Sequence, residues 1–84
     1  MNRIEWHTKA LRQLRKLPIS DNAEIRRAVG NLAEMPKCRN VRSLTTHEYG
    51  YRLRVGSYRV LFDWDSGEQV VEIQEVVRRD ERTY

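Results

Sequence analysis

The chain has 84 residues, of which 33% are charged and 39% hydrophobic, and its formal net charge is +4. This length fits a single domain, residues 1–84, near the lower size limit for a core without covalent staples. The only cysteine, Cys38, excludes an internal disulfide, and no apolar run is long enough to span a membrane. The N-terminal sequence MNRIEWH is not that of a signal peptide, so we expect a soluble, cytoplasmic protein without membrane association.

Charge is unevenly distributed along the sequence. Residues 37–59 contain six basic residues and one acid, Glu48, whereas residues 63–75 contain five acids and no base. Thirteen of the sixteen basic residues are arginine, whose planar fork of donors suits phosphate. Solvent exposure alone accounts for any single arginine, but the group taken together indicates an anionic partner.

The N-terminal part of the chain predicts a strand followed by a helix. Residues 3–7 alternate Ile4 and Trp6 with polar neighbours, as a short half-buried strand does. Thr8 can cap the following helix, and Pro18 ends it. The apolar positions of this helix recur at helical spacing: Ala10, Leu11, Leu14 and Leu17.

A second helix is predicted to begin near Asp21, with Glu24 at the reciprocal position of a capping box, and to end before Pro36. Its apolar stripe has the spacing i, i+3, i+4, i+7: Ile25, Ala28, Val29 and Leu32. We expect the two helices to form an antiparallel hairpin that packs its apolar stripes on a sheet.

Residues 49–63, YGYRLRVGSYRVLFD, alternate apolar and polar side chains around Gly56-Ser57, the signal for a two-residue type II′ turn. This turn pairs Val55 with Tyr58, Arg54 with Arg59, and Leu53 with Val60. One face of the hairpin is then apolar: Leu53, Val55, Tyr58, Val60 and Phe62. The other face carries Arg52, Arg54 and Arg59, whose mutual repulsion indicates that this face meets an anion.

The flanking segments complete the sheet. Residues 37–46 are less regular and are interpreted as a loop, and residues 70–77 as a last strand after a turn at Ser66-Gly67. A tight turn there would place Gln74 opposite Arg59 and extend the cationic face with Arg78. A bulge would substitute Arg79, and the sequence leaves this choice open.

These elements give the order β-α-α-β-β-β in an α+β domain, with a helical hairpin packed on a mostly antiparallel four-stranded sheet. The helices are expected to cover the apolar face, and the arginine face is expected to remain open.

The motifs for several chemistries are missing from the sequence. There is no glycine-rich phosphate loop, no metal-ligand spacing of cysteines and histidines, and no evident serine–histidine pair, so we expect neither a metal nor a cofactor. Arginines can grip a phosphate and neutralise charge that develops during phosphoryl transfer. RNA supplies its own nucleophile, the 2′-hydroxyl, and tyrosine can stack on a base or exchange a proton, so an RNA-cleaving site of these residues is physically coherent.

The hairpin sequence YRLRVGSYRVLFD and the ending VVRRDERTY resemble the RelE/ParE toxin superfamily of bacterial type II toxin–antitoxin modules. The resemblance covers nearly the whole chain in element order, and R-x-R-x-G-x-Y-R is its most specific signature. It implies a RelE-like toxin that cleaves mRNA in the ribosomal A site, without a metal, by 2′-hydroxyl attack. It also implies a cognate antitoxin that wraps the toxin, with operator DNA bound only by the complex of the two.

The resemblance assigns roles to individual residues. Arg59 matches the strand arginine that contacts the scissile phosphate, and Arg79 (or Arg78) matches the arginine at the end of the last strand. Tyr84 matches the terminal tyrosine that stacks on or protonates the substrate. Basic residues expected to lie beside the RNA are Arg52, Arg54, Arg78, Lys37 and Arg42, with Arg54 also a catalytic candidate.

The sequence departs from the superfamily at the general base. Some members use a lysine there, whereas this chain has arginine, which does not release its proton in proteins. His47 and Glu48, just before the hairpin, are the alternative candidates for this role, and each can equally be an ordinary loop residue.

Two other functions remain open at this point. The chain could be a ParE-like toxin that poisons gyrase, which would not need arginines in phosphate geometry. It could also be a non-catalytic module that binds nucleic acid through basic charge alone.

Overall fold

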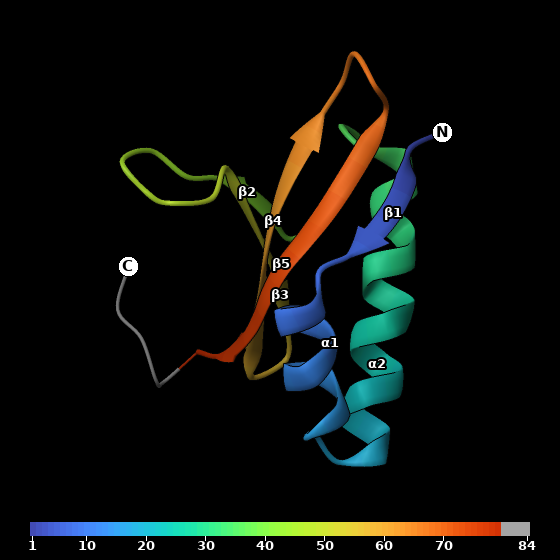
Figure 1. The fold of residues 1–84 in the computed structure, drawn as a ribbon, viewed down its shortest axis with the longest axis vertical. Coiled ribbons are helices and arrows are strands. Elements are labelled where there is room, and N and C mark those ends of the chain that lie inside the picture. The colour runs from blue at the N-terminus through green and yellow to red at the C-terminus, as the bar shows by residue number, and fades with distance from the viewer. Residues whose placement is uncertain (80–84) are drawn as a thin grey trace.

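The computed structural model describes residues 1–79 (Figure 1). Its elements, in chain order, are β1 (Arg3–Trp6), α1 (Thr8–Arg15), α2 (Ile19–Gly30), the 3-10 turn η1 (Asn31–Glu34), β2 (Val41–Ser43), β3 (Tyr51–Val55), β4 (Tyr58–Asp65) and β5 (Val70–Arg78). The strands form one five-stranded sheet in the order β1-β5-β4-β3-β2. Only β1 and β5 are parallel, and both helices lie on one side of the sheet. The expected α+β class with a helical hairpin on a mostly antiparallel sheet is confirmed.

The register of the central hairpin agrees with the prediction. Val55 pairs with Tyr58, Arg54 with Arg59, and Leu53 with Val60. Gly56 has a φ of 54°, which a residue without a Cβ adopts at no steric cost, and it occupies the first central position of the turn. The side chains on the apolar face are buried beneath the helices, so the arginines are placed on the opposite face.

The expectation of four strands was wrong, because part of the predicted loop at residues 37–46 forms β2. Val41 pairs with Leu53 and Arg42 pairs with Arg52 in an antiparallel edge strand. Three residues with an arginine at their centre are too short to show an alternating pattern. Their pairing is imposed by the free edge of β3 and not by their own sequence.

The last strand contains a bulge that decides between Arg78 and Arg79. Leu61 pairs with Glu75 and Phe62 pairs with Ile73, so Gln74 is an extra residue in β5. The predicted turn was too tight, since Asp65 pairs with Val70 and leaves residues 66–69 in the connection. Val77, and not Gln74, lies opposite Arg59, and the shift by one residue turns Arg79 towards the arginine side.

The helices bury the predicted stripes but begin differently from the prediction. Ala10 and Leu14 of α1 and Ile25 and Val29 of α2 are fully buried. Within residues 1–79, neither helix is long and apolar enough to cross a membrane.

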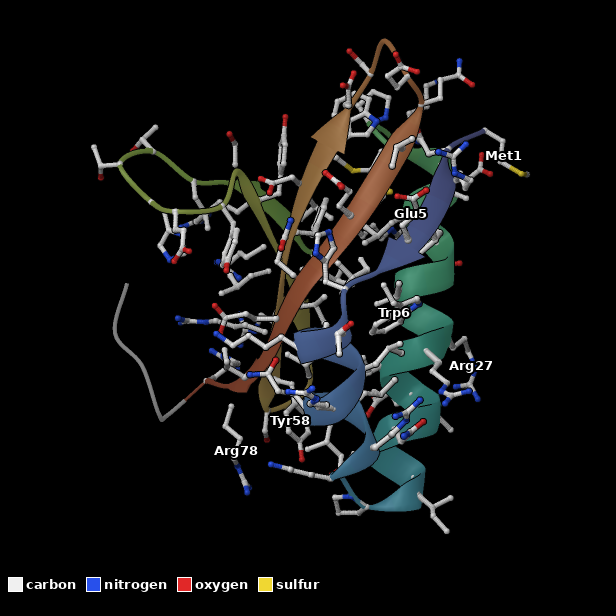
Figure 2. The ribbon with its side chains drawn as sticks, in the orientation of Figure 1. Met1, Glu5, Trp6, Arg27, Tyr58 and Arg78 are labelled. Carbon is white, nitrogen blue, oxygen red and sulfur yellow. The ribbon has the colours of Figure 1, made fainter. Side chains whose placement is uncertain are left out.

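The N-terminal caps predicted for the helices are not used. Residue His7 precedes α1, and Thr8 is already its first residue. The second helix starts at Ile19 after Pro18, so Asp21 lies inside its first turn and makes no capping box. Asp21 instead accepts a 2.8 Å hydrogen bond from the Tyr58 hydroxyl. This bond joins the start of α2 to the hairpin, at the Tyr58 labelled in Figure 2.

A buried side-chain amide just before β1 links η1 and β4 through hydrogen bonds. The side chain of Asn2 is almost fully buried, and its Nδ2 donates to the carbonyl oxygens of Ala33 and Met35, each at 3.1 Å. The indole Nε1 of Trp64 donates to Asn2 Oδ1 at 3.0 Å. One side chain thus satisfies polar groups from two distant segments.

We predict that Asn2→Ala lowers the free energy of unfolding by about 2–3 kcal/mol, because the Met35 carbonyl and the Trp64 indole N–H lose their hydrogen bonds to this side chain. Urea denaturation followed by tryptophan fluorescence measures the loss. Ile19→Ala is the matched control, since Ile19 is 89% exposed and its truncation should leave the denaturation midpoint unchanged. Equal midpoints for the wild type and Asn2→Ala would contradict this role of the amide.

Candidate nucleic-acid interface

The side of the sheet opposite the helices gathers five arginines, four from β2, β3 and β4 and one from the residue that follows β5. We call Arg42, Arg52, Arg54, Arg59 and Arg79 the arginine face. Pairing across the strands sets Arg42 beside Arg52 and Arg54 beside Arg59. Partial burial, followed by the charges of the other four arginines, lowers the pKa of Arg52. The five guanidinium groups therefore lie within electrostatic range of one another, as an anion-binding surface requires.

Arg59 and Arg79 have charged groups that are partly buried. The Nε and Nη1 atoms of Arg59 and the Nε of Arg79 are shielded from solvent. The backbone N–H of Arg79 donates to the Ser57 carbonyl at 2.8 Å, and its Nη1 donates to the Gly56 carbonyl at 3.3 Å. These bonds to the hairpin turn fix Arg79 near Arg59, so both are held in place before any ligand arrives.

Arg78 does not belong to this face. It pairs with Tyr58, and its guanidinium lies 5.8 Å from the centre of the Tyr58 ring. In Figure 2 its side chain extends away from the end of the sheet. Of the two arginines left open by the sequence, the structure therefore brings Arg79 and not Arg78 to the other arginines.

The arginine side of the sheet is less open than expected, because acidic and apolar side chains also lie there. Leu61 is fully buried and its cross-strand partner Glu75 is 2% exposed. Lys9 of α1 approaches Glu75, with 3.4 Å between Nζ and Oε2. The sequence analysis missed Glu75. Two adjacent polar residues between apolar neighbours, Gln74 and Glu75, nevertheless signal a break in the alternation of side chains along β5.

Tyr49 is a second residue that the sequence analysis did not single out. Burial raises its pKa to about 12, and the charges of Glu75 and Glu48 and their hydrogen bonds with its hydroxyl contribute to the shift. The phenol therefore stays protonated at neutral pH and can donate a hydrogen bond to a carboxylate. Tyr49 ties the segment before β3 to the buried Glu75.

The two candidates for a general base lie in the segment between β2 and β3, which projects from the sheet in Figure 1. His47 Nδ1 accepts a 3.1 Å hydrogen bond from the backbone N–H of Tyr49, so that nitrogen is unprotonated and engaged. A neutral His47 in this arrangement carries its proton on Nε2. Glu48 is exposed at the surface of the same segment.

The remaining predicted residues lie elsewhere. Lys37 is exposed and borders a recess between α2 and β3, on the helix side of the sheet. Tyr84 lies outside the described residues. Among residues 1–79, no group of three or more histidine, cysteine, aspartate or glutamate side chains is placed to hold a metal ion.

A recess in the arginine face itself has a volume of about 160 Å³. It is lined by backbone and side chains of β2, β3 and the residue before them: Asn40, Val41, Arg42, Arg52 and Arg54. The recess is open to solvent and mostly polar, and a phosphate group is small enough to enter it.

Comparisons with known proteins give a consistent family. Residues 4–83 match the family model described as the ParE toxin of a type II toxin–antitoxin system, parDE. The toxin–antitoxin complex RelBE2 from Mycobacterium tuberculosis contains a chain with 30% identity and a TM-score of 0.79, and the match covers 93% of this chain and 98% of that one. A search of curated protein sequences found no match.

Two further structures share the fold at lower identity. The archaeal RelE–RelB complex from Pyrococcus horikoshii OT3 matches with a TM-score of 0.81 at 23% identity, covering 96% of this chain and 98% of that one. The isolated RelE toxin of E. coli matches with a TM-score of 0.79 at 19% identity, covering 99% and 88%. The chain therefore belongs to the ParE toxin family of type II toxin–antitoxin systems, within the RelE/ParE superfamily, and has the fold of the RelE toxins.

Proposed function

We propose that this toxin is a metal-independent, ribosome-dependent endoribonuclease that cleaves mRNA through attack of the RNA 2′-hydroxyl on the adjacent phosphate. The observation that carries the proposal is the arginine face. Burial and the charges of the other four arginines lower the pKa of Arg52, and nitrogen atoms of Arg59 and Arg79 are shielded from solvent beside the hairpin. Such repulsion is tolerated where an anion relieves it.

The chemistry assigned to this face is charge neutralisation. In the reaction the 2′-oxygen forms a bond to phosphorus, the bond to the 5′-oxygen breaks, and negative charge builds on the phosphoryl oxygens. Arg59 and Arg79 are proposed to bind those oxygens, and Arg52 and Arg54 the neighbouring phosphates. Arg42 extends the same surface along β2.

Proton transfer needs other groups, since guanidinium does not give up its proton. Glu48 and His47 are proposed as alternatives for the general base that removes the 2′-hydroxyl proton. His47 would have to release the N–H bond from Tyr49 before its Nδ1 can accept the proton. Tyr84 remains the proposed residue that stacks on the base or protonates the leaving oxygen.

The proposed partners are a cognate antitoxin, the ribosome and mRNA, with operator DNA bound only by the toxin–antitoxin complex. The solved relatives from Mycobacterium tuberculosis and Pyrococcus horikoshii are themselves toxin–antitoxin complexes, which supports an antitoxin for this chain. A basic toxin favours an acidic partner that folds on binding. The toxin is proposed to act in the cytoplasm, where ribosomes are found.

A second function, inhibition of gyrase, is favoured by one observation: the family model that matches residues 4–83 is that of ParE toxins. A gyrase inhibitor needs a protein-binding surface and not a set of guanidinium groups in phosphate geometry. The arginine face therefore favours RNA cleavage. Binding of nucleic acid without cleavage is the third alternative, and it would use the same basic surface.

We predict that Arg59→Ala abolishes growth arrest and lowers mRNA cleavage on ribosomes by about a hundredfold or more, as the loss of one preorganised donor does. Arg12→Ala is the matched control, because Arg12 is an exposed arginine of α1 and is not part of the arginine face. Growth curves, primer extension on a translated mRNA and circular dichroism measure toxicity, cleavage and folding. Full toxicity of a folded Arg59→Ala protein would exclude this role.

We also predict that the purified wild-type chain stops cell-free translation and leaves DNA supercoiling by gyrase unchanged. Both assays are run over the same range of toxin concentration, so that their outcomes can be compared directly. Inhibition of supercoiling without cleavage of mRNA would instead establish the ParE-like activity.

A further inference from the structure

A second, larger recess lies on the helix side of the sheet, between α2 and the edge of β3, and the proposed cleavage site does not use it. Its volume is about 400 Å³, within the range of sites that bind small molecules. Its accessible apolar surface comes from the half-buried residues Ala28 and Cys38, which lie above the buried side chains of Leu32 and Leu53. Two amide side chains, Asn31 and Asn40, also border it.

The rim of this recess is cationic. Lys37, Arg39 and Arg54 border it, and Glu34 is the one acidic residue in its lining. Lys37 and Arg39 are both exposed, so their charges are available to a ligand. An apolar floor with amides suits the face and the edge of a nucleobase, and a cationic rim suits its phosphate.

The recess connects with the arginine face at Arg54. This residue borders the 400 Å³ recess, the 160 Å³ recess of the arginine face, and a third recess of 260 Å³ beside the hairpin turn. The reason lies at the sheet edge, because β2 begins at Val41, opposite Leu53, and does not cover Arg54. There the backbone N–H of Arg54 donates to the Asn40 carbonyl at 3.0 Å as the chain leaves the sheet.

We propose that this helix-side recess binds a nucleotide of the RNA that flanks the nucleotides held on the arginine face. The base packs against the half-buried Ala28 and Cys38, with its polar edge at Asn31 or Asn40. The phosphate lies between Lys37 and Arg39. Arg54 contacts the RNA where it passes around the edge of β3, between the arginine face and the recess. The inference rests on the proposed RNA substrate, and it assigns the recess a role in the choice of the sequence to be cut.

The experiment compares two double variants that remove the same charges. K37A/R39A alters the rim of the recess, and R12A/K16A removes one arginine and one lysine from the exposed surface of α1. The four nucleoside 5′-monophosphates and inorganic phosphate are titrated into each purified protein, and amide chemical shifts of Leu32, Leu53 and Asn40 report binding in the recess. Thermal melting verifies that both variants are folded.

We expect at least one monophosphate to shift these amides, and K37A/R39A to weaken its binding by about tenfold while R12A/K16A does not. In mRNA cleavage on ribosomes, K37A/R39A should change the nucleotide preferred beside the cut. Equal weakening by both variants, binding of inorganic phosphate as tight as that of the nucleotides, or binding only of an acidic peptide would each overturn the proposal.

These outcomes separate the inference from the proposed nuclease activity. Normal cleavage with unchanged sequence preference and no nucleotide in the recess refutes the inference alone. Nucleotide binding in the recess of a protein that does not cleave mRNA refutes the nuclease and leaves the recess as a nucleotide site.

Discussion

The register in which β2, β3 and β4 pair is the constraint on which the rest of the structure depends. Arg54 opposite Arg59 and Arg42 opposite Arg52 are each unfavourable, by about 0.2–1 kcal/mol for a like-charge pair. The same register buries Leu53, Val55 and Val60 on the other face, and each such side chain contributes about 1.5–3 kcal/mol. A slip by one residue would exchange the two faces, so the core enforces the repulsion.

Three residues of the arginine face, Arg42, Arg52 and Arg54, are consequently held by packing and not by ion pairs within residues 1–79. The ion pairs recorded within residues 1–79 join Arg3 to Glu5, His7 to Glu72, and Lys9 to Glu75, and none of them involves Arg42, Arg52 or Arg54. An internal carboxylate would have cancelled their repulsion and also their attraction for phosphate. The acidic segment, residues 63–75, is therefore separated from these arginines in the structure as well as in the sequence. Its residue Glu75 contacts Lys9 and Tyr49 instead of these arginines.

The sequence predicted those parts of the fold that are determined by residues close together in the chain. Gly56 specifies its turn, and the alternation on both sides of it specifies which side chains face the core. The bulge at Gln74 was not predictable in this way, because it depends on the register in which β5 pairs with β4. That register depends on the length of the connection between the two strands, which a Ser-Gly pair does not determine. A single inserted residue decides whether Arg78 or Arg79 joins the site, so the candidate site was less predictable than the fold. The same holds for β2 and for the contact of Tyr49 with Glu75, which arise only after distant segments are brought together.

A site built from arginines keeps its charge across the physiological range, and this limits the origin of any pH dependence. Even with a lowered pKa, Arg52 remains a cation near neutrality, so the arginine face can bind and stabilise charge but cannot move a proton. Glu75, which lies nearby, is buried against Lys9 and Tyr49 and is not available to accept one without breaking those contacts. The proposed reaction therefore assigns proton transfer to His47, Glu48 and Tyr84 or to the RNA complex itself. The two proposed tasks are separate in the chain, because strands carry Arg42, Arg52, Arg54 and Arg59, whereas His47 and Glu48 lie in the segment that projects from the sheet.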